Sequence, residues 1–208
     1  MKKNLIALLV ALFLTPAIMN AQFHLSLGPV AGFNFNIHSS SDINKTPVGL
    51  GLVFGAQCDM AFSKSFGLVT NVLFFDGRYG GYSDTQNGVN YDVGTSIGYF
   101  TIEPMAKFTL PSSGIHFLVG PMIGFNIQSS MDISYSYQGQ SGNQTSTLRD
   151  MNILFGLKGG AGWDMQLSKL MTLTPQVFIS YDLTQLQKDS NWNVFTIQAA
   201  CALKFHLL

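Results

Sequence analysis

The chain has 208 residues, of which 47 % are apolar and 11 % charged, and its 11 basic residues balance its 11 acidic ones. This balance excludes the basic surplus with which proteins attract nucleic acid. The length suits one domain, and beyond Gln22 no continuous apolar stretch is long enough to cross a bilayer as a helix. The hydrophobic residues must therefore be distributed by alternation.

The N-terminal residues have the features of a secretory signal peptide. Lys2 and Lys3 form a positive start, residues 5–14 are an unbroken apolar run, and Pro16 follows ahead of the small residue Ala21. The run is shorter than the roughly 20 residues that span a bilayer as a helix, which favours a cleaved signal over a retained anchor. We expect residues 1–21 to be removed and residues 22–208 to form the mature domain.

From Phe23 onward the sequence alternates with the period of two that is typical of β-strands. Between Phe23 and Ile37 the odd positions are apolar, and the even positions are mostly polar or small. The same pattern predicts eight strands, over residues 23–37, 48–62, 66–75, 97–109, 115–128, 151–167, 171–182 and 194–207.

The connections between these segments alternate in length. Residues 63–65, 110–114 and 168–170 are short turns, whereas residues 38–47, 76–96, 129–150 and 183–193 are long and polar. Eight antiparallel strands with both termini on the short-turn side predict an all-β, closed up-and-down transmembrane β-barrel.

Side-chain size and charge indicate which face of the strands points into the lumen. The less apolar face carries many glycines and balanced charges, which suit the narrow interior of an eight-stranded barrel. The other face is almost free of charge and would form an apolar belt facing lipid. We expect a structural ion network in the lumen, built from Asp59, Glu103, Lys107, Lys158, Asp164 and Lys204.

The two cysteines, Cys58 and Cys201, fall on outward faces of the second and eighth predicted strands. In a closed barrel the first strand separates these two strands by roughly 9 to 10 Å, which is beyond the reach of a disulfide. We expect both cysteines to be free and to face lipid.

The second half of the sequence repeats the first. HLSLGPVAGFN at residues 24–34 matches HFLVGPMIGFN at residues 116–126, and GAQCDMAFSK at residues 55–64 matches GAGWDMQLSK at residues 160–169. Asp59 and Lys107 therefore correspond to Asp164 and Lys204. Pro29 and Pro121 also correspond, and because proline cannot donate a ladder hydrogen bond we expect each at a bulge or irregularity.

The chain resembles the outer-membrane β-barrel domain proteins (PorT-like, porin family) of the Bacteroidota type. The resemblance covers nearly all of the mature chain and rests on the Ala-Gln signal junction, the opening strand with GPVAGFN, the E-P-M-A-K-F stretch at residues 103–108, and the apolar, aromatic final strand. It implies a protein of the Gram-negative outer membrane, inserted by the barrel-assembly machinery and surrounded by lipid.

Candidate chemistry is sparse in this sequence. His24 and His116 are equivalent by repeat, but no further ligands converge with them, so we expect luminal hydrogen bonding and no metal site. The segment from His38 to Asp42 holds His, Ser and Asp, the residue types of a loop-based lipid acyltransferase, yet no motif fixes their geometry. The tyrosine-rich loop at residues 129–150 suits recognition, or extends the adjoining strands.

We therefore expect a monomeric outer-membrane barrel with a lumen filled by side chains, no cofactor and no catalytic residue, and a structural or surface-interaction role through its long loops. Two alternatives remain open at this point. One is a component associated with transport or protein secretion across the outer membrane, which the PorT-like resemblance implies, and the other is the acyltransferase. A nucleic-acid partner is not expected, and the surface partner is unknown.

Overall fold

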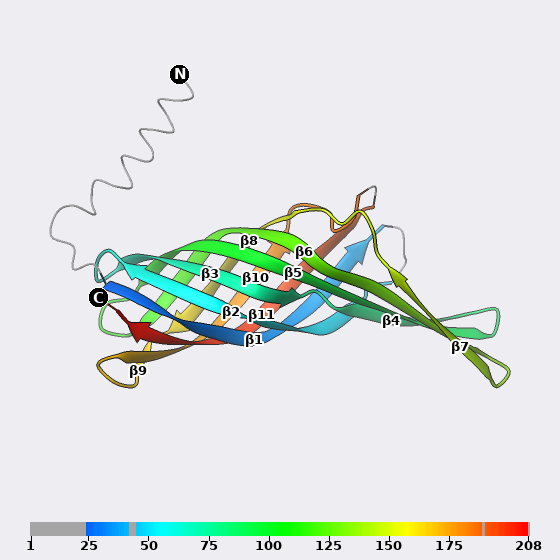
Figure 1. Ribbon diagram of the computed structural model, residues 1–208, viewed down its shortest axis with the longest axis horizontal. Helices are drawn as coiled ribbons and strands as arrows, with labels where there is room; N and C mark the ends of the chain where they lie inside the picture. The colour runs from blue at the N-terminus through cyan, green and yellow to red at the C-terminus, as the bar shows by residue number, and fades with distance from the viewer. Residues whose placement is uncertain (1–23, 42–44, 189, 208) are drawn as a thin grey trace, which may run out of the picture.

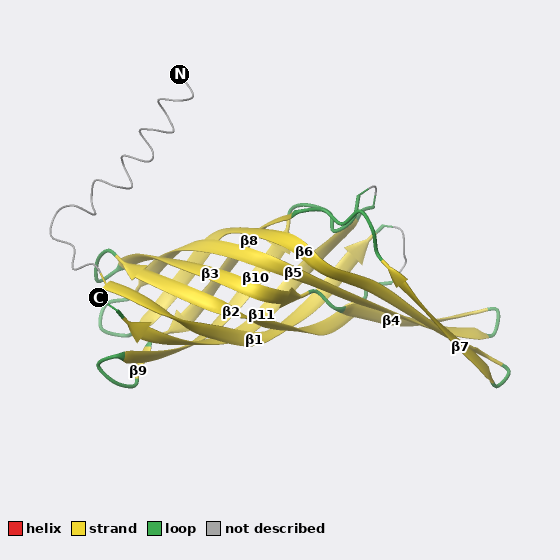
Figure 2. Cartoon of the chain, in the orientation of Figure 1, coloured by secondary structure: helices red, strands yellow, loops and turns green. Residues whose placement is uncertain are grey.

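The computed structural model describes residues 24–41, 45–188 and 190–207, and within them the chain is built from β-strands (Figure 2). The expected signal peptide, residues 1–21, lies outside the described residues. No helix in the described part of the chain has the length and hydropathy needed to cross a membrane.

Eight long strands form a closed antiparallel ring (Figure 1). Each pairs with the next, and β11 pairs with β1 to close the ring. The strands are β1 (His24–Ser40), β2 (Val48–Ala61), β3 (Phe66–Gly77), β5 (Val89–Thr109), β6 (Ile115–Tyr137), β8 (Leu154–Trp163), β10 (Met171–Asp182) and β11 (Trp192–His206). The prediction of an eight-stranded, up-and-down, all-β barrel is confirmed.

Three short strands accompany the ring: β4 (Gly80–Gln86), β7 (Gln140–Thr147) and β9 (Met165–Gln166). β4 and β7 lie within segments that the sequence pattern assigned to long connections. The prediction of a long loop at residues 76–96 was wrong, whereas for residues 129–150 the sequence also allowed an extension of the adjoining strands. β8 and β9 occupy one predicted strand. Both pair with β10 in the same register, and the strand is interrupted only at Asp164.

The two faces of each barrel strand have the environments that alternation predicts. On β1, Asn34 and Asn36 are fully buried in the lumen, whereas the alternating residues Phe33 and Phe35 are 61 % and 40 % exposed. The outward faces of the other strands are also rich in exposed Leu, Val, Ile and Phe. In water this belt would be an aggregation surface, and in a bilayer it is solvated by lipid.

A β-bulge in β3 changes which side chains reach the lumen. Leu73 pairs with Thr101, but Asp76 pairs with Tyr99, so β3 contains one residue more than β5 between these pairs. The extra residue reverses the alternation, because a bulge opposes two residues to one on the partner strand. Asp76 therefore points inward and is almost fully buried.

The prolines interrupt the ladders without changing their register. Between β1 and β11 the pairing passes from Leu27–Phe205 to Val30–Ala202, with a gap beside Pro29. Between β5 and β6 it passes from Ile102–Ile123 to Ala106–Val119, where Pro104 stands opposite Pro121. Each proline keeps its pairing with the other neighbouring strand. The expected irregularity is therefore a local gap in one ladder, not a bulge.

Side chains fill the lumen in layers of apolar and polar residues. One apolar cluster surrounds Val30 and Leu73, and a second joins Val69, Met105 and Phe178. A third lies at the long-loop end, where Leu186 from the β10–β11 connection is fully buried. The remaining members of this cluster are Ile97, Tyr99, Met122, Leu154 and Val194.

The cysteines provide a test of the outward face. Cys58 and Cys201 are free, and both lie on the lipid-facing sides of β2 and β11. In intact lipid vesicles we expect neither thiol to react with a membrane-impermeant maleimide, whereas a Ser141→Cys variant on exposed β7 reacts fully. Full labelling of the native cysteines in vesicles would place that face in water and contradict the orientation of the strands.

Candidate functional site: the lumen and the outward arm

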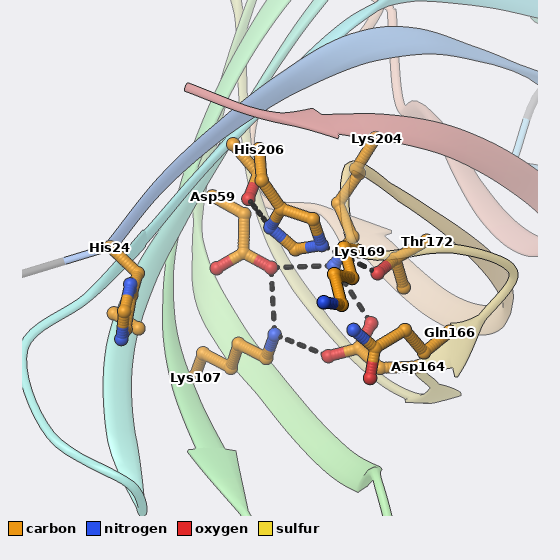
Figure 3. Close-up of a pocket in the computed structure, with 11 residues that line it drawn as sticks. His24, Asp59, Lys107, Asp164, Gln166, Lys169, Thr172, Lys204 and His206 are labelled. Carbon is orange, nitrogen blue, oxygen red and sulfur yellow. Dashed lines mark hydrogen bonds and ion pairs between the residues drawn. The ribbon is translucent and has the colours of Figure 1, made fainter. Parts of the chain in front are cut away.

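Four charged side chains form a closed ring in the lumen near the short-turn end (Figure 3). Lys107 Nζ lies 2.7 Å from both Asp59 Oδ2 and Asp164 Oδ2. Lys204 Nζ lies 2.6 Å from Asp59 Oδ2 and 2.7 Å from Asp164 Oδ1. Each lysine thus bridges both aspartates, and each aspartate bridges both lysines. Such mutual pairing offsets the cost of removing four charges from water.

The ring joins positions that the sequence repeat makes equivalent. Asp59 on β2 corresponds to Asp164 at the β8–β9 interruption, and Lys107 on β5 corresponds to Lys204 on β11. The two halves of the chain therefore each supply one acid and one base to the same cluster.

The other two members of the expected network form a separate pair in the middle of the lumen. Lys158 Nζ lies 2.7 Å from Glu103 Oε1, donates to Gln198 Oε1 and stands 4.8 Å from the centre of the Phe178 ring. Asn71 donates to the second oxygen of Glu103 at 3.0 Å. The structure thus divides the six expected residues into a ring of four and a pair.

A third buried ionic cluster lies toward the long-loop end and was missed by the sequence reasoning. Arg78 donates through Nη2 to Asp76 Oδ2 at 2.8 Å, and its Nη1 lies 3.5 Å from Asp182 Oδ1. Nη1 also donates to Thr196 at 2.6 Å, and Asn34 donates to the other oxygen of Asp76. The sequence pattern had placed Asp76 and Arg78 in a loop, because the β3 bulge is invisible in the alternation.

A cavity of about 540 Å³ opens below the ring at the short-turn end. Figure 3 shows Lys107 and Lys204 directed at the two aspartates, with His206 beside them. His206 lies 2.9 Å from both Ser26 Oγ and Thr172 Oγ1.

His24 lines the cavity, whereas its repeat equivalent His116 is fully buried with Nδ1 3.5 Å from Asp164 Oδ2. The two histidines therefore have different environments.

His38, the histidine of the acyltransferase hypothesis, is fully buried at the other end of the barrel. Its Nδ1 accepts the indole N–H of Trp192 at 2.9 Å, and its Nε2 lies 3.1 Å from the Tyr79 carbonyl oxygen. Both ring nitrogens thus have partners. Asp42 lies outside the described residues, and Ser41 Oγ accepts a bond from Asn191.

At the long-loop end a four-stranded sheet, here called the arm, extends beyond the barrel (Figure 1). It consists of β4, residues 89–95 of β5, residues 130–137 of β6, and β7, paired in that order. Asn87-Gly88 and Gln138-Gly139 close its two hairpins, and all four residues have positive φ. This is the geometry of two-residue hairpin turns, whose twist matches that of the strands. The sequence allowed two interpretations of the tyrosine-rich loop: a recognition loop, or an extension of the adjoining strands. The structure shows an extension of the strand predicted at residues 115–128, which continues as β6 to Tyr137.

The two faces of the arm differ in chemistry. Cross-strand pairing places Tyr82, Val93 and Ile133 on one face, together with Tyr91 opposite Tyr135. The edge strands add Asp84, Gln86, Gln140 and Gln144 to this face. The opposite face consists of hydroxyl, amide and carboxylate side chains: Ser83, Thr85, Asn90, Asp92, Ser130, Asp132, Ser134, Ser136, Ser141, Asn143, Thr145 and Thr147.

These features define a transmembrane β-barrel with a lumen filled by side chains. Comparison with known families supports the same class, because a family described as outer membrane protein beta-barrel domain matches residues 20–187. The chain belongs to this family and is an outer-membrane β-barrel protein. The narrower resemblance to PorT-like proteins stays a prediction.

Solved structures of small outer-membrane barrels are similar to this chain at low identity. Ail, the attachment invasion locus protein of Yersinia pestis, is 13 % identical, with 87 % of this chain and 99 % of that chain covered and a TM-score of 0.44. Neisserial surface protein A is 14 % identical, with 88 % and 97 % covered and a TM-score of 0.40. OprG of Pseudomonas aeruginosa is 10 % identical, with 90 % and 96 % covered and a TM-score of 0.41. No curated protein sequence matches the chain.

The ring of four charges predicts a specific pattern of stability losses. Lys107→Met leaves two aspartates facing one lysine, so we expect the free energy of unfolding to fall by about 3–5 kcal/mol. Lys204→Met should have a similar effect, because each lysine bridges the same two carboxylates. Urea unfolding in lipid vesicles, followed by heat-modifiable gel mobility, measures both.

Two further variants make this test selective. Lys169→Met changes an exposed lysine at the same cavity and should alter stability by less than about 0.5 kcal/mol. Adding Asp164→Asn to Lys107→Met removes the excess negative charge and should restore more than half of the loss. A Lys107→Met variant as stable as Lys169→Met would show that the ring does not stabilise the barrel.

Proposed function

We propose that this protein is a non-conducting outer-membrane barrel whose arm binds a partner at the cell surface. The first and last described residues, His24 and Leu207, lie at the short-turn end of the barrel, and in outer-membrane barrels the short turns face the periplasm. The arm extends from the opposite end of the barrel (Figure 1). A barrel inserted in this orientation carries its arm on the outer side of the membrane. The observation that carries the proposal is the apolar and aromatic face of this arm.

This face leaves large aromatic side chains exposed on the surface of the arm. Tyr135 and Tyr137 are 48 % and 45 % exposed, and Tyr91 lies directly opposite Tyr135 on the neighbouring strand. Tyrosine offers a large contact area with only two side-chain torsions and a hydroxyl that can hydrogen-bond, and it is enriched where proteins recognise one another. The opposite face of the same strands, by contrast, pairs its own polar groups, as in Ser83 with Asp92 and Thr145 with Asp132.

The filled lumen supports a binding role over a diffusion pore. Ionic clusters and apolar clusters alternate along the barrel, and Leu186 with Val194 closes the long-loop end. Eight strands enclose an interior just wide enough for such side chains. We also propose that the protein is not an enzyme. In support, the ring of His38 is engaged at both nitrogens by Trp192 and Tyr79 and does not face a serine nucleophile.

Site-specific photo-crosslinking on intact cells tests the arm directly. A benzoylphenylalanine at position 91 or 135 lies on the tyrosine face, and one at position 134 or 136 lies on the polar face of the same strands. In cells that naturally produce the protein, we expect discrete adducts from positions 91 and 135 and none from positions 134 and 136.

The matched positions decide the outcome, because all four variants share the same barrel and lie on the two central strands of the arm. Equal crosslinking from both faces, or none from either, would overturn the surface-binding role. Adducts with a component of a secretion apparatus would identify the arm as a secretion contact, the second function that the sequence had left open.

A further inference from the structure

An apolar pocket lies where the arm meets the mouth of the barrel, on the tyrosine face of the arm. Its volume is about 250 Å³. Tyr82, Val93, Met131 and Ile133 line it from the arm, and Pro47 and Trp192 line it from the barrel rim. Below it lies the apolar cluster of Ile97, Leu186 and Val194, against which Trp192 also packs.

The lining of this pocket contains no charged side chain among the described residues, although charges surround it. Lys45 pairs with Asp84 on the nearby hairpin at 3.3 Å, and Asp132 neighbours Met131 and Ile133 but belongs to the polar face. The polar residues that reach the pocket are uncharged Ser, Thr and Gln. Among these, Thr95 already donates its hydroxyl to the Gly80 carbonyl at 3.0 Å.

The main aromatic wall of the pocket is held in place. Trp192 donates its indole N–H to His38 Nδ1 at 2.9 Å, and the two rings lie 5.6 Å apart. His38 is in turn fixed by the Tyr79 carbonyl oxygen. Because the indole nitrogen is already engaged, Trp192 offers the pocket mainly its apolar ring surface. A preformed apolar wall of this kind is typical of small-molecule sites.

We propose that this pocket binds a small, uncharged apolar molecule that carries a single aromatic ring. The volume is below the roughly 300–1,000 Å³ that holds a drug-sized ligand, which limits the occupant to about the size of one ring with a short chain. The aromatic rings of Tyr82 and Trp192 in the lining favour an aromatic ring in the ligand. A charged group would lose its hydration there without gaining an oppositely charged partner from the described lining residues, so the pocket selects against ions. The inference goes beyond the proposed function, because it concerns a small-molecule site and does not depend on a macromolecular partner of the arm.

Tryptophan fluorescence provides a direct readout of ligand binding in the pocket. The chain has two tryptophans, and Trp163 lies at the short-turn end of β8, away from the pocket. A Trp163→Phe variant in lipid nanodiscs therefore reports on Trp192 alone. Titration with 3-phenylpropan-1-ol should give a saturable shift of its emission to shorter wavelength, as the ligand displaces water from the indole.

Charge-matched probes test the selectivity in the same variant. We expect 3-phenylpropanoate and 3-phenylpropylammonium to bind at least ten-fold more weakly than the alcohol, because either charge must be desolvated in the pocket. A linear, non-saturating response to the alcohol would reveal partition into lipid and would overturn the proposal. Equal binding of the charged probes would also overturn it.

Two arm variants locate the site. In the Trp163→Phe background, Ile133→Asp places a charge in the pocket and should weaken binding of the alcohol at least ten-fold. Ser136→Asp introduces the same charge on the polar face of β6, three residues toward the tip and outside the pocket lining, and should leave binding unchanged. Met131→Glu serves as a second pocket variant if Ile133→Asp loses its heat-modifiable mobility. Binding unaffected by the pocket variants would place the ligand elsewhere.

Discussion

A bilayer core offers no hydrogen-bond partner to a peptide group, and this constraint governs the architecture of the protein. A membrane-spanning sheet must pair every strand on both sides, which it achieves only by closing on itself. Here β11 returns to β1 to complete the ring. Once eight strands close, the lumen is so narrow that side chains fill it, and every charge inside must find a partner within that space. Closure, the narrow lumen and the need to pair every charge together account for the three ionic clusters.

Equivalent residues of the two sequence repeats have related positions in the closed barrel. Equivalent acids and bases of the two halves meet in one ring, where each charge has two partners of opposite sign instead of one. Gly28 and Gly120 occupy equivalent positions in the opening motif of each half, and each lies close to the backbone of a neighbouring strand. A Cβ atom at Gly28 would collide with the Leu203 carbonyl oxygen, and one at Gly120 with that of Pro104. These glycines allow the neighbouring strands to approach closely beside the proline gaps.

Alternation was sufficient to predict the strands, their inward faces and the closure, because one face meets lipid and the other meets a crowded lumen. It also pointed to the six charged residues that the structure places in the ring and the central pair. It could not reveal Arg78 with Asp76, because the bulge near Phe74 reverses the phase of β3 without any mark in the pattern of hydrophobicity. Nor does alternation report that two acids and two bases from distant strands share one cluster.

Apart from the extension of β6, the arm was missed for a different reason. Its strands lie in polar segments, where one face is Ser, Thr and Asn and the other is tyrosine, so hydropathy alone makes them resemble loops. Asn87-Gly88 was the available signal, because this dipeptide is the strongest short-range mark of a two-residue hairpin. Gln138-Gly139 is a weaker signal, since Gln rarely adopts the positive φ of 48° that it has here. The pocket at the base of the arm depends on both hairpins and on Trp192, so no local pattern could predict it.

The central claim is that ion pairs and apolar side chains close the lumen, so that the protein acts through its surface. Single-channel recording of the full-length protein in a planar bilayer tests this claim most directly, with a 16-stranded porin in the same bilayer as the control for an open channel. The account predicts current at the level of the bare bilayer while the porin conducts. A steady, reproducible conductance from the folded protein, well above that background, would contradict it.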